Sequence, residues 1–296
     1  MGTVNLFKGL GVALVTPFKN TGEVDYSALS NMVDYLINGG INFLCALGTT
    51  AETPTISYFE QELITKRVVA QVDGRVPILV GCTSNCTTKV IERLNKHPFK
   101  GVNGILSAVP YYNKPTQEGI YQHFSAIAKE SELPIILYNI PGRTGVNMTS
   151  ETTLRLAVDY KNIIGIKEAS GDIEQIREII KNKPDEFSVI SGDDPITLQA
   201  IRYGASGVIS VIGNALPTIF GNMVHKAMAK DYSAAELINS KLENLYRLLF
   251  VEGNPAGIKA LLYLMNKIEY NLRLPLTPVT ANTMNQIREE LKKIEA

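Results

Sequence analysis

Short apolar runs rich in β-branched residues recur at intervals of about 20–40 residues, and a segment of helical periodicity follows each of them. Leu29, Met32, Val33 and Leu36, for example, share one face of a predicted helix. The predicted strands are Val12–Val15, Phe43–Leu47, Pro77–Val80, Gly104–Val109, Ile135–Tyr138, Ile163–Lys167, Ser188–Ile190 and Gly207–Val211. Strands that alternate with helices indicate parallel βαβ units, and eight such units favour a closed (β/α)8 TIM barrel over an open doubly wound sheet. No GxGxxG follows the first strand, which argues against a dinucleotide-binding sheet.

The strand pattern stops near residue 230. Beyond it, Asp231–Phe250, Pro255–Asn266 and Ala281–Glu295 have the periodicity of helices. We therefore expect two domains, a catalytic barrel over residues 1–230 and a C-terminal helical domain over residues 231–296.

Composition narrows the class of function. Lys and Arg together number 29, as do Asp and Glu, so the net charge attracts neither nucleic acid nor an anionic membrane surface. No apolar run approaches the length of a membrane span, and Met1–Lys8 lacks the pattern of a secretory signal. We expect a cytoplasmic protein. The three cysteines and three histidines lack the spacing of disulfide frameworks or metal sites, so we expect no metal and no cofactor.

Reactive side chains follow several of the predicted strands. Lys167 ends the sixth strand, Tyr138 ends the fifth, Arg143 lies in the next loop, and Thr49 and Thr50 follow the second. In a parallel barrel these positions share one rim, and that rim is where barrel enzymes keep their active sites.

Lys167 sets the predicted chemistry. Desolvation at a strand end favours the neutral amine, which attacks a ketone or aldehyde to form a Schiff base. A lysine that snorkels to solvent is the alternative, and for an isolated lysine it would be preferred. A nearby Tyr138 phenol could move protons, a threonine turn could hold a carboxylate, and Arg143 could bind another carboxylate. Alone, each could equally be an ordinary turn, a packed tyrosine or a surface arginine, but together they favour the Schiff base.

Four stretches resemble the dihydrodipicolinate synthase family in order and spacing, over essentially the whole chain. They are Gly48–Glu52 (GTTAE), Pro110–Pro115 (PYYNKP), Tyr138–Gly145 (YNIPGRTG) and Gly165–Ser170 (GIKEAS). Ala51 is a departure, because the family usually has glycine there, and its methyl group would alter the turn if φ were positive.

The resemblance implies a class I aldolase that condenses pyruvate with L-aspartate 4-semialdehyde in lysine and diaminopimelate biosynthesis. Lys167 would carry pyruvate as a Schiff base. Tyr138 would transfer protons through the Thr50 hydroxyl to Tyr112, which in the family comes from a neighbouring subunit. Members are commonly homotetramers built as dimers of dimers.

The resemblance also assigns substrate-binding roles. Thr49 and Thr50 would hold the pyruvate carboxylate, and Arg143 would bind the carboxylate of the aldehyde. Gly192 and Ile209 match positions that line the pyruvate pocket.

Many family members bind lysine as an inhibitor at a subunit interface. The matching positions here are Thr53, Pro54, Ile56, Tyr58, Gln61, Asn85, Lys89 and Tyr111. Lysine-sensitive members have a histidine where Tyr58 stands and a glutamate where Lys89 stands. Lys89 would repel a ligand that carries two ammonium groups, so we predict weak or absent inhibition by lysine.

Two other functions compete. N-acetylneuraminate lyase and related keto-acid aldolases share the barrel, the lysine and the tyrosine, but they resemble one another in a serine-glycine pair where this chain has Arg143-Thr144. A catalytically dead barrel that binds keto acids as a regulator is the non-enzyme alternative, and the intact Lys167, Tyr138 and Thr50 argue against it.

Overall fold

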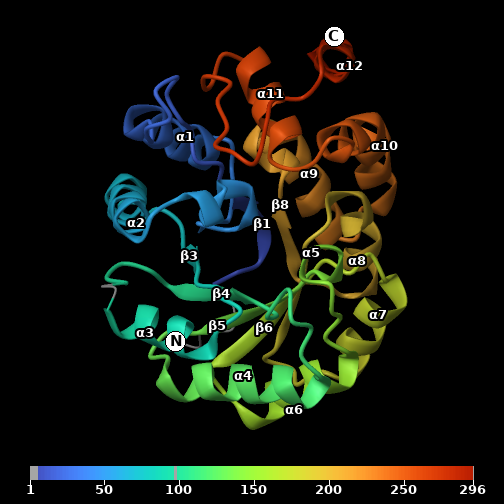
Figure 1. Cartoon of the computed structure of the whole chain (residues 1–296). Helices are drawn as coiled ribbons and strands as arrows, with labels where there is room; N and C mark the ends of the chain where they lie inside the picture. Colours follow the sequence, from blue (N-terminus) through green and yellow to red (C-terminus); the bar gives the residue numbers. More distant parts are fainter. Residues whose placement is uncertain (1–5, 97–98, 296) are drawn as a thin grey trace.

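The computed structural model describes residues 6–96 and 99–295, and eight parallel strands close into a barrel at its centre (Figure 1). The strands are β1 (Gly9–Ala13), β2 (Phe43–Ala46), β3 (Ile78–Gly81), β4 (Gly104–Ala108), β5 (Ile135–Asn139), β6 (Ile163–Glu168), β7 (Ser188–Ser191) and β8 (Gly207–Ser210). Each strand pairs with the next along the chain, and β1 pairs with β8. The predicted TIM barrel is confirmed. The segment Met1–Lys8 is described only from Leu6 onward.

Helices surround the barrel and gather beyond β8 at one side (Figure 1). They are α1 (Tyr26–Asn38), α2 (Tyr58–Val72), α3 (Thr87–Lys96), α4 (Gln117–Glu130), α5 (Pro141–Thr144), α6 (Ser150–Asp159), α7 (Ile173–Asn182), α8 (Thr197–Tyr203), α9 (Pro217–Met228), α10 (Tyr232–Phe250), α11 (Ala256–Leu264) and α12 (Ala281–Glu295). Many begin at a capping side chain. Asp25, for example, accepts hydrogen bonds from the Ser27 and Ala28 amides at the start of α1.

Strand boundaries differ from the predicted ones mainly at β1, which starts at Gly9 rather than Val12. A Cβ at Gly11 would lie 2.2 Å from the Phe43 ring, so only glycine leaves the space that this ring occupies in the barrel. Glycine has low strand propensity, which explains why the pattern of apolar residues missed this part of the strand. At the other end of the prediction, β6 continues one residue past Lys167 to Glu168.

Side chains alternate between the barrel interior and the layer beneath the helices. On β5, Ile136 and Tyr138 belong to the interior cluster, whereas Ile135 and Leu137 pack in the outer layer. This alternation follows from the two-residue period of a strand. The interior cluster also holds Ala13, Phe43, Cys45, Leu79, Leu106, Ala108, Ile190 and Ile209.

The C-terminal helices share a core with the barrel. Leu245 of α10 and Leu261 of α11 lie in the same buried cluster as Leu10 and Val12 of β1. A buried ion pair adds to this contact, because Lys259 Nζ lies 2.5 Å from Glu52 Oε1 and neither side chain is exposed. The boundary between residues 1–230 and 231–296 falls between α9 and α10, and the division into two domains stays a proposal. Within the part of the chain that the structure describes, we find no helix whose length and hydropathy would let it span a bilayer.

Candidate active site

Lys167 and Tyr138 stand side by side at the carboxyl ends of neighbouring strands. Tyr138 of β5 is in register with Lys167 of β6. Lys167 is 5% exposed, and its Nζ lies 4.5 Å from the centroid of the Tyr138 ring. A nearly dry amino group beside a phenol is the arrangement that imine chemistry requires, because the amine can act as a nucleophile and the phenol can carry protons.

Gly192 leaves room for the carbon chain of the Lys167 side chain. A Cβ at Gly192 would lie 2.9 Å from Lys167 Cε and 3.1 Å from its Cγ, so the glycine keeps that side clear.

Burial raises the pKa of the Asp193 carboxyl, and the charge of Lys167 opposes that rise. Burial also raises the pKa of Cys45 to about 11, so its thiol stays protonated near neutral pH. Ile209 is fully buried in the same interior cluster as Cys45 and Tyr138.

Glu168 points away from the barrel interior and fixes the strand ends. Its carboxylate accepts hydrogen bonds from Asn139 Nδ2 at 3.1 Å, from Gln175 Nε2 at 3.0 Å and from the Ser170 amide at 2.9 Å. Asn139 directly follows Tyr138, and Glu168 directly follows Lys167. This buried network therefore holds the Tyr138 and Lys167 side chains in a fixed relative position.

The threonine turn after β2 is a short 3₁₀ segment, Thr49–Ala51. Thr50 is buried and Thr49 is partly exposed. Ala51 is 1% exposed and is not among the residues with positive φ, whereas Glu52 has φ of 59°. The Ala51 methyl group is therefore accommodated, because the left-handed conformation falls one residue later.

Asn254, which lies just before α11, connects two of the predicted site residues. Its Nδ2 donates to Thr50 Oγ1 at 3.0 Å, and its backbone carbonyl accepts from Arg143 Nη2 at 3.2 Å. The C-terminal region thus orients both the threonine hydroxyl and the guanidinium at the barrel mouth.

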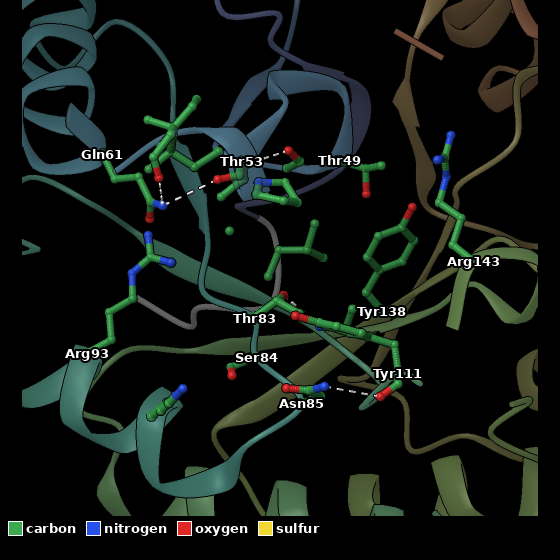
Figure 2. A pocket seen from close by; sticks show the side chains of 18 of the residues that line it. Thr49, Thr53, Gln61, Thr83, Ser84, Asn85, Arg93, Tyr111, Tyr138 and Arg143 are labelled. Atoms are coloured by element: carbon green, nitrogen blue, oxygen red, sulfur yellow. Dashed lines mark hydrogen bonds between the residues drawn. The ribbon is translucent and has the colours of Figure 1, made fainter. Parts of the chain in front are cut away.

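A cavity of about 620 Å³ opens at this mouth. Thr49, Tyr138 and Arg143 line it, and Tyr138 lies between the other two in Figure 2. Thr50, Lys167 and Ile209 are buried, Gly192 is half-buried, and none of the four is in the described lining. The structure therefore brings seven of the eight predicted residues to the carboxyl ends of the barrel strands, and three of them line the cavity.

Tyr112 is the exception. Its side chain is 83% exposed, its backbone has φ of 77°, and it is absent from the described cavity lining, whereas the preceding Tyr111 is part of it. Within one chain, Tyr112 does not join the other candidates.

Sequence reasoning missed Asn254, Glu168 and Gln175. Asn254 falls in the interval between the predicted helices Asp231–Phe250 and Pro255–Asn266. Its position between a glycine and a proline was the available signal, because a polar residue there is fixed in a turn rather than in a helix face.

Comparison with known proteins gives one consistent family. The model of the dihydrodipicolinate synthetase family matches residues 6–294. The 4-hydroxy-tetrahydrodipicolinate synthase of Phocaeicola vulgatus is 56% identical over 288 residues, which cover 97% of each chain. The dihydrodipicolinate synthase of Acinetobacter baumannii, described as chloride inhibited and solved in complex with pyruvate, has a TM-score of 0.94 and 40% identity over 97% of this chain and 99% of that one. The synthase of Cyanidioschyzon merolae, solved with lysine bound, has a TM-score of 0.94 and 38% identity over 97% and 98% of the two chains.

Proposed function

The chain belongs to the dihydrodipicolinate synthetase family, and from this premise we propose that it condenses pyruvate with L-aspartate 4-semialdehyde to 4-hydroxy-tetrahydrodipicolinate. It is an enzyme of the lyase class and of the Schiff-base-forming aldolase type. The pairing of the Lys167 amine with the Tyr138 ring carries the proposal, because it supplies a buried nucleophile with a proton carrier beside it.

Lys167 and Tyr138 carry out the covalent and proton-transfer steps of the proposed reaction. Lys167 Nζ attacks the ketone carbon of pyruvate, and water leaves as the Schiff base forms. Loss of a methyl proton gives the enamine, whose carbon attacks the aldehyde of the second substrate. The amine of that substrate then attacks the imine carbon, closes the ring and releases Lys167. Each step moves a proton, and Tyr138, whose ring centroid lies 4.5 Å from Lys167 Nζ, is the group that we propose to carry it.

The Thr50 hydroxyl is the second member of the proposed proton path. Its oxygen accepts a hydrogen bond from Asn254, so its own hydrogen is available to another acceptor. The third member, Tyr112, is exposed, which supports a role in the site of a second copy of the chain. A homotetramer built as a dimer of dimers and a cytoplasmic location are part of the same proposal.

The remaining residues hold the substrates. Thr49 and Thr50 bind the pyruvate carboxylate, and Gly192 and Ile209 form the wall of the pocket around it. Arg143 binds the carboxylate of the aldehyde, because a planar guanidinium at the cavity wall suits that group.

Trapping the Schiff base tests the proposal. Borohydride added with pyruvate should attach one pyruvate-derived mass to the peptide that carries Lys167. Lys167→Ala should lose both the adduct and the condensation activity, whereas Lys241→Ala, a change at an exposed position on α10, should keep both. Lys259 is a second buried lysine whose pKa burial lowers to about 8, so an adduct there instead would refute the assignment.

Two assays separate the alternatives. Turnover of pyruvate with aspartate 4-semialdehyde, together with no cleavage of sialic acid, supports the synthase over an N-acetylneuraminate lyase. An adduct without turnover of either substrate would instead support a keto-acid-binding regulator.

A further inference from the structure

The last two strands of the barrel meet along a sparse seam. Ser191 and Val208 are the one pair in register between β7 and β8 in the described chain, whereas the other neighbouring strands are in register over three to five residue pairs. Near the amino end of this seam, the Ser206 amide donates to the Val189 carbonyl at 2.8 Å. The carboxyl end of the seam, where the site lies, is left to be joined by other groups.

The Asp194 side chain joins the two strands at that end. It lies in the turn after β7 and is 2% exposed. Its Oδ2 accepts hydrogen bonds from the Val211 amide at 3.0 Å and from the Ile212 amide at 2.8 Å, in the turn that follows β8. This second turn is also connected to β1, because Asn214 Nδ2 donates to the Ala13 carbonyl at 2.8 Å. One carboxylate oxygen therefore links the turn after β7 to the rest of the rim.

Asp194 is next to one predicted wall of the pyruvate pocket, and its partners are next to the other. Gly192 precedes Asp194 by two positions, and Ile209 precedes the first of the two bound amides by two positions. The Gly192 amide also donates to the Glu168 carbonyl at 2.7 Å, which connects this turn to the strand that carries Lys167. The carboxylate thus sets the distance between the segments that carry Gly192 and Ile209.

An ionised carboxylate is a costly connection at this depth. Burial raises the pKa of Asp194 to about 6, even though the hydrogen bonds from the Ile212 and Val211 amides lower it. At the opposite end of the barrel a neutral side chain joins two strands, because Asn42 Oδ1 accepts from the Leu10 amide at 2.7 Å between β2 and β1. The group that costs more stands beside the site, which is where side chains that serve function at the expense of stability are found.

We propose that Asp194 is a positioning residue that holds Gly192 and Ile209 at the separation that pyruvate requires beside Lys167. The carboxylate does not touch pyruvate and acts only through the two backbone amides. This inference rests on the proposed function, because it concerns how tightly pyruvate is held before it reacts. Loss of the connection should therefore raise KM for pyruvate and leave kcat, which depends on Lys167 and Tyr138, nearly unchanged.

Steady-state kinetics and borohydride trapping over a range of pyruvate concentrations test the proposal. Asp194→Ala removes both accepted hydrogen bonds, so KM for pyruvate and the pyruvate concentration for half-maximal trapping should rise about fivefold or more, with kcat changed less than about twofold. Asp194→Asn keeps an acceptor oxygen for the two amides, and its KM should stay within about twofold of the wild-type value. Asp194→Ser has a side chain shorter by one bond, replaces Asp194→Ala if that variant does not fold, and should also raise KM.

Asn42→Ala is the matched control, because it removes a side-chain acceptor that joins two strands at the opposite end of the barrel. It should lower the thermal midpoint, as Asp194→Ala does, and leave KM for pyruvate unchanged. A wild-type protein that forms no adduct with pyruvate would refute the proposed function and this inference with it. An adduct on the wild type, together with an unchanged KM for Asp194→Ala, would refute this inference alone. An equal rise of KM in Asn42→Ala, or in Asp194→Asn, would do the same.

Discussion

Asn254 Nδ2 donates a hydrogen bond of 3.0 Å to Thr50 Oγ1, between two buried residues that are 204 positions apart in the sequence. The amide can only donate from this nitrogen, so it fixes the direction of the bond. The Thr50 hydroxyl hydrogen is consequently left to point elsewhere, which is what a proton path through this hydroxyl requires.

Removing this donor should impair turnover. We expect Asn254→Ala to lower kcat about fivefold to tenfold, because a buried hydrogen bond contributes about 1 kcal/mol and the hydroxyl would lose its orientation. Asn254→Asp should lower kcat at least as much, since an ionised carboxylate would draw the Thr50 hydrogen toward itself. Steady-state kinetics with both substrates measure the effect, and the exposed Asn244→Ala is the control. An Asn254→Asp enzyme with normal kcat would contradict this role.

Arg143 should matter for the second substrate rather than for the first. Its guanidinium has a contact to the Asn254 carbonyl at 3.2 Å and otherwise faces the cavity. Arg143→Ala should reduce kcat/KM for aspartate 4-semialdehyde about tenfold or more, the cost of a lost charge-assisted hydrogen bond, while pyruvate trapping persists. Arg288→Ala, far along the chain on α12, serves as the matched control. Unchanged use of the aldehyde by Arg143→Ala would refute the assignment.

Lysine should inhibit weakly or not at all. Lys89 and Arg93 both contribute positive charge to the cavity wall, and a lysine ligand adds two ammonium groups. Initial rates at subsaturating pyruvate, measured over a range of lysine concentrations, provide the test. Strong inhibition by sub-millimolar lysine would show that the charge argument is wrong. Lys89→Glu should make the enzyme more sensitive to lysine than the wild type.

An ion pair between α2 and the C-terminal region should make the free energy of unfolding depend on pH in the acid range. Arg273 donates to Glu60 at 3.0 Å and 2.5 Å, and this contact is the main reason that the pKa of Glu60 falls to about 2. Because the folded pKa lies below the ordinary value of 4.5, the pair stabilises the protein fully above about pH 4.5 and loses its effect as pH falls toward 2. Its contribution is at most about 3 kcal/mol.

Glu60→Gln tests this dependence, because glutamine can still complete the helix cap with Ser57. The thermal midpoint of the variant should lie below that of the wild type at pH 7, and the difference should shrink as pH falls from 4.5. Glu92→Gln removes an exposed pair and should show little difference at either pH. A gap that widens in acid would contradict the assignment.

The sequence was sufficient to predict the barrel and to place Lys167 near the end of its strand, because both depend on local periodicity. Tyr138 and Lys167 each end a predicted strand, so they are expected at one rim of a parallel barrel, and the order of the two strands along the chain makes them neighbours. Gly9 and Gly11 of β1 were not recognised, since their use depends on the Phe43 ring of another strand.

Contacts between segments that are distant in the sequence could not be predicted from the sequence. No local pattern connects Asn254 to Thr50, or Lys259 to Glu52. The role of Ala51 depended on a backbone angle, and the left-handed residue proved to be Glu52. The position of Tyr112 relative to a working site is fixed by a second copy of the chain in our proposal, and a single sequence does not encode that geometry in any local pattern.

The buried Glu52–Lys259 pair constrains how this protein can evolve by recombination. Glu52 directly follows the threonine turn Thr49–Ala51, and its counter-ion is supplied by α11. In a chimera that kept the barrel but received unrelated C-terminal helices, the Glu52 carboxylate would be buried without a cation to form an ion pair. The C-terminal segment can therefore be exchanged only between chains that have a buried cation at the position of Lys259. The threonine turn and α11 must be inherited together.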